Sequence, residues 1–196
     1  MRMHTDGSVK TAFKCLLTAF LILTALLCFT GCDGRTAPPA QPTEAFEGNI
    51  SPRASFSLKG LSPEGAETAA LSDGDRSSPC RLKCAGSTGE IIADLGAVYR
   101  VCRLDAYPAS DGTYTGRLFP RCFEVLCSVN GKDYTKVIKY DNIDAPDCVP
   151  VLEFPPADAR YVKIVISGFA AGEGTNIAEI AELELISFFG EYAYPS

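Results

Sequence analysis

From residue 49 onward the sequence consists of short runs in which apolar and polar residues alternate, separated by turn-forming residues. In the run 122–128, for example, Phe123, Val125 and Cys127 occupy every second position. A period of two places such side chains on one face of a strand, whereas a helix requires a repeat of about 3.6 residues. Comparable runs lie at 90–95, 98–107, 134–140, 149–154, 161–167 and 177–187. Seven or eight short strands at this spacing predict an all-β antiparallel sandwich.

Local signals add one hairpin and one helix to this outline. Asn130-Gly131 lies between two strand-like runs and predicts a hairpin with a type I′ turn, which requires positive φ at both central residues. The best helical segment is 63–71, with Ser62 as its N-cap and Asp73-Gly74 beyond its end.

Composition excludes several classes of function. The chain has 196 residues, a formal net charge of −6, no Trp and a single His. An acidic chain without a basic run lacks the clustered Lys and Arg that binding to nucleic acid requires. Because the only histidine is His4, close to the N-terminus, His-dependent catalysis and His-based zinc sites are excluded as well. The length suits one domain with appendages.

The N-terminal sequence predicts an export signal. Residues 1–14 carry three basic side chains, and residues 15–32 carry no charge and are rich in Leu. The sequence Phe-Thr-Gly-Cys at 29–32 is similar to a bacterial lipobox, in which the cysteine, here Cys32, is lipidated and becomes the new N-terminus. We therefore predict a lipoprotein signal peptide over 1–31. An uncleaved transmembrane anchor and ordinary secretion are the alternatives.

The predicted lipid determines the expected location. Acyl chains such as palmitate on Cys32 would hold the protein at the extracytoplasmic face of a bacterial cell membrane. Residues 32–48 are rich in Pro, Ala, Thr and Glu and predict a semi-extended linker. The β-sandwich domain is expected over 49–188, and residues 189–196 form a C-terminal tail.

Five short motifs occur in a characteristic order. They are LSDGD at 71–75, IADLG at 92–96, FEVLCSVNG at 123–131, ARYVKI at 159–164 and AELEL at 181–185. Together they resemble the coagulation factor V/VIII type C (discoidin) domain, a family that includes many bacterial carbohydrate-binding modules. The resemblance covers about residues 50–187. It implies an eight-stranded antiparallel jelly roll of the galactose-binding-domain type, with binding loops at one end and no catalysis.

A calcium site is expected at the first of these motifs. Asp73, Asp75 and Ser78 lie in a glycine-containing turn that brings oxygen ligands together, as Ca²⁺ requires. The resemblance implies that Glu182 completes the site from the last strand and that Ala181 offers its carbonyl. The ion would be structural. An ordinary Asp-Gly turn with solvated carboxylates is the alternative.

Two loops offer the aromatic and polar side chains that sugar recognition requires. The loop 107–120 contains Tyr107, Asp111, Tyr114 and Arg117, and the loop 169–176 contains Phe169, Glu173 and Asn176. The resemblance implies that both loops lie at the same end of the sandwich. The alternative is that the aromatic residues close the end of the barrel and the charged residues are solvated.

At two positions the chain departs from the family pattern, so the ligand-binding residues of the relatives cannot be assigned to it one by one. Sugar-binding relatives often have Arg directly after the Pro that ends the second long strand, whereas this chain has Pro108-Ala109. The family commonly has a Trp near the position of Cys80, and this chain has no Trp. Any stacking on a ligand must therefore come from Tyr or Phe.

Six of the nine cysteines follow Cys32, and an even number in an exported domain predicts disulfides. Their pairing is open. Zinc binding is disfavoured by the spacing, and Cys127 has the parity of a core residue. The six are Cys80, Cys84, Cys102, Cys122, Cys127 and Cys148.

The expected function is a non-catalytic, membrane-anchored binding module, active as a monomer, for a glycan or another extracellular polymer. The alternative is a protein–protein adhesion module that uses the same loop end. An exposed apolar patch around Phe188, Phe189, Tyr192 and Tyr194 would distinguish it. A hydrolase is disfavoured, because calcium binding and strand alternation already explain the paired carboxylates.

Overall fold

The computed structural model describes residues 46–65, 67–109, 116–143, 150–172 and 175–188. All of them belong to one compact unit, Pro39–Ser196. This part of the chain forms strands and two short 3₁₀ helices, η1 and η2. In chain order the elements are β1 (Gly48–Asn49), η1 (Ser51–Arg53), β2 (Ser55–Lys59), β3 (Leu61–Pro63), η2 (Thr68–Leu71), β4 (Cys80–Cys84), β5 (Thr88–Pro108), β6 (Cys122–Ser128), β7 (Thr135–Tyr140), β8 (Val151–Ser167), β9 (Ala170–Gly172) and β10 (Thr175–Ser187).

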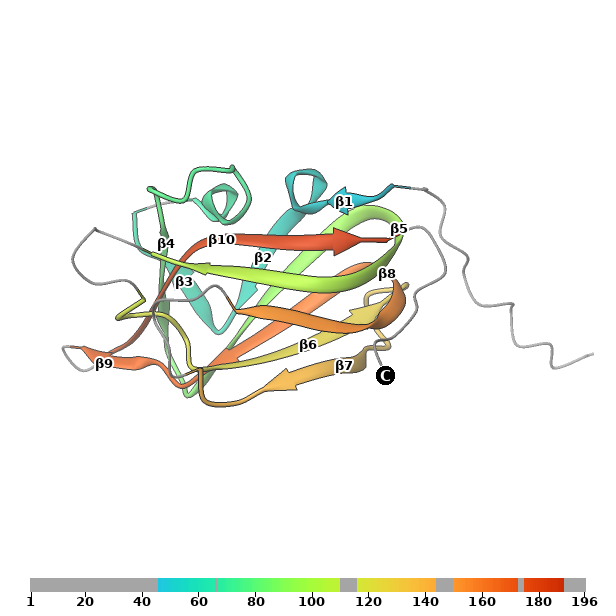
Figure 1. Cartoon of the computed structure of the whole chain (residues 1–196). Coiled ribbons are helices and arrows are strands. Elements are labelled where there is room, and N and C mark those ends of the chain that lie inside the picture. The colour runs from blue at the N-terminus through green and yellow to red at the C-terminus, as the bar shows by residue number, and fades with distance from the viewer. Residues whose placement is uncertain (1–45, 66, 110–115, 144–149, 173–174, 189–196) are drawn as a thin grey trace, which may run out of the picture. The chain divides into compact units, whose positions relative to one another are not determined.

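Two long strands, β5 and β8, belong to both layers of the sandwich (Figure 1). The first half of β5 pairs with β2 and with the second half of β8, which in turn pairs with β6, and β6 pairs with β7. The second half of β5 pairs with β10 and with the first half of β8. Beyond β10 the second layer continues through β4 to β3. Every pairing is antiparallel, as expected for a jelly roll.

The bend of β5 has a local cause at Gly96. Gly96 has φ of 77°, a backbone conformation that residues with a Cβ atom disfavour. Its N–H donates to Oδ1 of Asp94 at 2.9 Å. The β5–β8 register is interrupted between Asp94 and Tyr99. The strand thereby leaves one layer and enters the other.

The core lies between the layers and is filled by the alternating positions of the strands. Phe123, Val125 and Cys127 of β6 are buried, as are Val162 and Ile164 of β8. The second layer contributes Leu104, Leu152, Phe154, Ile180, Leu183 and Leu185. These side chains form one continuous cluster, which supplies the main apolar driving force for the fold.

β1 fastens the start of the domain to the end of β10. Gly48 pairs with Ser187, and the Ile50 N–H donates to the Leu185 carbonyl at 2.8 Å. The Leu185 N–H in turn donates to Oγ of the buried Ser51 at 2.6 Å. The other end of β10 pairs with β9. Figure 1 accordingly shows β1 and β9 at opposite ends of β10.

The all-β sandwich predicted from the sequence is confirmed, but the strand boundaries differ. The predicted runs 90–95 and 98–107 are parts of the single strand β5, and 149–154 and 161–167 fall largely in β8. The short strands β1, β2, β3, β4 and β9 were not predicted. The described residues therefore contain ten strand segments where eight strands were expected.

The predicted hairpin is present with a different turn, and the predicted helix is wrong. β6 and β7 pair as expected, and Gly131 has φ of 71°, but Asn130 does not share a positive φ. The Asn130 Oδ1 instead accepts the backbone N–H groups of Lys132 and Asp133, both at 2.9 Å. Of the segment 63–71 only η2 is helical, and Pro63 belongs to β3.

The predicted signal peptide 1–31, Cys32 and most of the linker 32–48 lie outside the described residues, as does the tail 189–196. Within the described ranges, no helix is long and apolar enough to cross a bilayer.

Candidate functional site

Segments distant in the sequence meet at the end of the sandwich where β10 begins. The Gly116 N–H donates to the Ala109 carbonyl at 2.9 Å and closes the loop that follows β5. The Glu179 N–H donates to the Leu118 carbonyl, also at 2.9 Å, and places this loop against β10. The Arg121 N–H bonds to the Ser167 carbonyl at 3.1 Å. The described parts of both predicted ligand loops therefore lie at the same end, as expected.

Three predicted ligand residues are placed at this end. Arg117 is exposed, and Phe169 is half-buried against the core cluster. Asn176 donates from Nδ2 to the Gly86 carbonyl at 2.7 Å, which ties β10 to the turn after β4. Of the other four, Tyr107 is described below, and Asp111, Tyr114 and Glu173 lie outside the described residues.

The side chain of Tyr107 contacts Arg76 and Glu184. The Arg76 guanidinium lies over its ring, 3.5 Å from the centroid, and its hydroxyl lies 3.3 Å from Oε2 of Glu184. Arg76 Nη2 also contacts Glu184 Oε1 at 2.9 Å. Burial and the Glu184 charge raise the pKa of Tyr107. Arg76 covers one face of the Tyr107 ring, so this face is not open to a sugar, and Tyr107 contacts the loop 72–79 through it. The role of Tyr107 in ligand binding stays a prediction.

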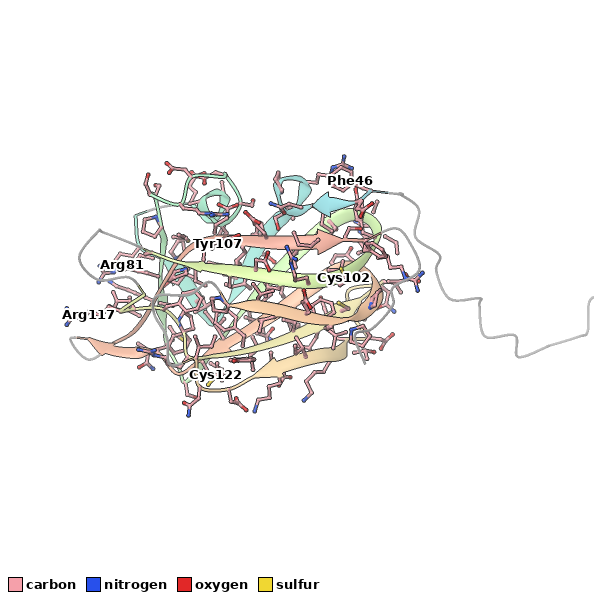
Figure 2. All side chains as sticks on the ribbon, viewed as in Figure 1. Phe46, Arg81, Cys102, Tyr107, Arg117 and Cys122 are labelled. Atoms are coloured by element: carbon pink, nitrogen blue, oxygen red, sulfur yellow. The ribbon has the colours of Figure 1, made fainter. Side chains whose placement is uncertain are left out.

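A cluster of charged residues that the sequence reasoning missed lies at the same end as Arg117. Arg81 Nη1 contacts Glu179 Oε1 at 3.2 Å, and its Nε lies 3.2 Å from Glu64 Oε2 in a geometry that makes no hydrogen bond. Lys83 Nζ contacts Glu64 Oε1 at 2.7 Å. Figure 2 shows Arg81 and Arg117 at one end of the molecule. The alternation in CRLKC at 80–84 was the signal that could have revealed this strand.

The predicted calcium site lies beside a bulge in β10. Ile180 pairs with Pro108 and Glu182 with Tyr107, so Ala181 is an additional residue. Glu182 is only 1% exposed, and its Oε2 accepts the Gly74 N–H at 3.2 Å. Burial raises the pKa of Glu182, and the charge of Asp73 raises it further. The turn and the last strand, 108 residues apart in sequence, are therefore in contact.

The remaining predicted ligands are oriented differently. Oδ1 of Asp75 accepts both the N–H of Ser77, at 2.9 Å, and its hydroxyl, at 2.6 Å. Ser78 donates its N–H to the Asp75 carbonyl at 3.3 Å. Within the described ranges, no three His, Cys, Asp or Glu side chains are arranged to hold a metal. Asp73, Ala181 and Glu182 fit a cation, because the buried Glu182 carboxylate lies near the Asp73 charge and its pKa stays raised although Arg76 lowers it. Asp75 does not fit in this orientation.

The five described cysteines are free thiols, so the predicted disulfides are not found among them. Cys80 and Cys84 stand four residues apart on β4, which separates their Cα atoms by about 13 Å and exceeds the reach of a disulfide. Cys127 is a core residue, as the alternative interpretation held. Cys148 lies outside the described residues.

The aromatic patch expected for an adhesion module is largely untested. Phe188 is half-buried, and Phe189, Tyr192 and Tyr194 lie outside the described residues. The exposed large hydrophobic residues of the described chain are Val129, Tyr140 and Val151, which come from different strands and turns.

Known structures share this architecture. CpGH89CBM32-5 from Clostridium perfringens, solved in complex with GalNAc-β-1,3-galactose, is 17% identical with a TM-score of 0.60, covering 71% of this chain and 99% of that chain. The family 32 CBM of C. perfringens NanJ, solved with galactose, is 23% identical with a TM-score of 0.56 and covers 71% and 98%. The C-terminal domain of a chitobiase from Bacteroides fragilis is 16% identical with a TM-score of 0.57 and covers 72% and 98%.

Identities below 25% establish the shared fold. A comparison with curated proteins found no match. The model of one protein family matches residues 53–183, which include most of the sandwich and the whole of the loop end. By this match the chain belongs to the F5/8 type C domain family.

Proposed function

We propose that this protein is a non-catalytic carbohydrate-binding module that recognises a glycan with the loops around Arg117, Phe169 and Asn176. The observation that carries the proposal is the convergence of the two loop segments at one end of the sandwich. The exposed Arg117 guanidinium offers hydrogen bonds for hydroxyl groups, and the half-buried Phe169 ring at the same end offers an apolar surface for the CH face of a sugar. Two solved structures of this fold hold galactose-containing ligands, which supports a sugar as the ligand.

The test is a titration with galactose, N-acetylgalactosamine and a uronic-acid glycan. Arg117→Ala should weaken binding by about tenfold or more, because a direct hydrogen bond to a charged group contributes about 1.5–3 kcal/mol. Lys132→Ala is the matched control, since Lys132 is exposed on the β6–β7 turn. Equal binding by both variants contradicts the proposal. Failure to bind any glycan, together with capture of a defined protein, favours the adhesion module.

We further propose that the module is attached by lipid on Cys32 to the extracytoplasmic face of a bacterial membrane. The basic and apolar segments before Cys32 support this. Intact mass should show wild-type protein that begins at Cys32 and carries acyl chains, and a Cys32→Ser variant that carries none. Wild-type protein that keeps residues 1–31 and has no acyl chains would instead indicate an uncleaved anchor.

We also propose that Ca²⁺ binds between the turn 73–75 and β10, with Asp73, Glu182 and the Ala181 carbonyl as ligands. The bound ion would neutralise the buried carboxylate of Glu182 and hold the first loop against the last strand.

A further inference from the structure

A second bulge lies at the opposite end of β10, in β5. Ile186 pairs with Arg103 and Ser187 pairs with Val101, so Cys102 is an additional residue in the β5–β10 register. A bulge interrupts the ladder and redirects the neighbouring side chains. Here a pocket of about 280 Å³ opens, with Glu47, Cys102, Arg103, Glu153, Ile186 and Phe188 among its lining residues. Figure 2 shows Cys102 well away from Arg81 and Arg117.

The pocket carries an excess of negative charge. Arg103 forms an ion pair with Asp105, in which Nη2 lies 2.9 Å from Oδ2. Glu47 and Glu153 are both exposed at the rim, and neither forms an ion pair within the described residues. At the pocket floor burial raises the pKa of the Cys102 thiol, the Arg103 charge lowers it, and the charges of Glu153 and Asp105 raise it again. A ligand with a positive charge is therefore favoured over an anion.

The pocket also offers a hydrogen-bond donor. The Arg103 side chain lines the pocket and is 37% exposed, and its Nη2 contacts Asp105. A guanidinium carries five N–H donors, so one that is not used on Asp105 can donate to a ligand oxygen. Ile186 and Phe188 add an apolar wall, on which a CH-rich ring can pack.

We propose that this pocket binds a 2-amino sugar whose amine is free and protonated, such as a glucosamine unit of a de-N-acetylated glycan. The ammonium pairs with Glu47 and Glu153, a hydroxyl oxygen accepts from Arg103, and the ring packs on Phe188. A neutral sugar lacks the charge, and a simple alkylamine lacks the oxygen. The choice of a sugar as the carrier of the amine rests on the proposed function; the charge preference rests on the pocket alone.

The experiment follows backbone amide shifts of the ¹⁵N-labelled protein during titration with D-glucosamine, N-acetylglucosamine, glucose and 1,5-diaminopentane. Glucosamine should shift the amides of Gly48, Cys102 and Ile186 in a saturable manner. N-acetylglucosamine and glucose should leave them unchanged, because acetylation removes the charge. Diaminopentane should bind more weakly than glucosamine. Added salt should weaken the glucosamine interaction, since the rim carboxylates are exposed.

Variants locate the interaction. Glu153→Gln and Glu47→Gln should each weaken glucosamine binding about threefold to fivefold. Glu124→Gln on β6 is the control, since Glu124 is a partly exposed strand carboxylate of the other layer, 3.6 Å from Lys136. The proposal is overturned if these amides do not shift at any soluble glucosamine concentration, if N-acetylglucosamine or diaminopentane binds as tightly, or if Glu153→Gln binds normally.

A further variant separates this proposal from the proposed function. Arg117→Ala should weaken recognition of neutral glycans at the loop end by about tenfold or more and leave the glucosamine shifts intact. Absence of neutral-glycan binding with intact glucosamine shifts would contradict the loop-end function alone.

Discussion

At Gly168 the fold has no room for a side chain. This glycine follows β8 with φ of 68°, and a Cβ atom there would lie 2.8 Å from Cβ of Arg121. The close approach is the same one that brings the two loops of the candidate site together.

Gly168→Ala should therefore lower the free energy of unfolding by about 1–3 kcal/mol, from backbone strain and the steric conflict. Urea denaturation measures this. Gly86→Ala serves as the control, because a Cβ at Gly86 meets nothing within 4 Å and the residue needs no positive φ. Equal stability of the two variants would show that the loop contact at Gly168 is dispensable.

The thiols of the domain differ in their accessibility. Cys127 lies in the core, and burial raises its pKa to about 12, whereas Cys122 at the start of β6 is half-exposed. The reactive species is the thiolate. Iodoacetamide at pH 8 should modify Cys122 much faster than Cys127, which should react only on unfolding. Peptide mass mapping measures both rates, and comparable rates at the two cysteines would contradict the buried position of Cys127.

Residue-scale prediction from the sequence succeeded where a side chain follows a regular strand. The alternation in 122–128 correctly placed Cys127 in the core. It did not reveal that Arg76 covers one face of Tyr107, because Arg76 is 31 positions earlier and reaches the ring through the loop 72–79. It missed Arg81 because the alternation in the five residues of β4, which indicates a strand, was not used.

At the scale of elements, bulges and bends determine which residues face one another. The extra residue Ala181 places Glu182 and Glu184 on the outer side of β10, opposite Tyr107 and Asp105. The sequence AELEL does not reveal this shift, so the position of Glu179 relative to these two glutamates could not be predicted. β5 and β8 were each predicted as two separate strands. The local alternation does not show that one strand continues through a bend.

The bend of β5 is stabilised by a carboxylate, and this gives it a pH dependence. Arg160 donates from Nε and Nη2 to Asp94 at 3.0 and 3.2 Å. These bonds, with the Gly96 N–H, hold the pKa of Asp94 below its usual value. A folded pKa below the unfolded one contributes stability above about pH 4, which is lost as the pH falls through the folded pKa.

Asp94→Asn should reduce stability at pH 7 and flatten the stability profile between about pH 2 and 4 relative to wild type. Denaturation at a series of pH values measures both. Asp133→Asn in the β6–β7 turn is a suitable comparison, because the Asp133 carboxylate accepts a hydrogen bond from Asn130 and forms no ion pair in the described part of the chain. A wild-type acid slope in the Asp94→Asn variant would mean that other carboxylates determine the low-pH behaviour.

At the scale of the whole molecule, the proposed calcium ion connects the first part of the domain to its last strand. Calcium at a hundred times its Kd should stabilise the native state by about 2.7 kcal/mol if it binds only the folded form. The thermal midpoint should therefore rise when calcium replaces a chelator, and Glu182→Gln should abolish the rise. Identical midpoints in calcium and chelator would contradict the site.

The overall architecture was the most predictable level. The motif order from 71–75 to 181–185 anticipated the family that the match over 53–183 established. It also anticipated the contact between the turn 73–75 and Glu182, observed as the bond from Gly74. The pocket at Cys102 was not predictable, because it depends on a bulge and on the entry of the chain beside Glu47.

The position of β1 has a mechanical consequence. A pulling force applied between the chain entering at Gly48 and a ligand held by the loops at the far end would run along the whole length of β10. Hydrogen bonds of an antiparallel pair lie perpendicular to the strands, so this force loads them in shear, all together rather than one after another. Rupture in shear needs a larger force than peeling. The clamp made by Ile50, Ser51 and Leu185 is then the point at which the domain would yield first.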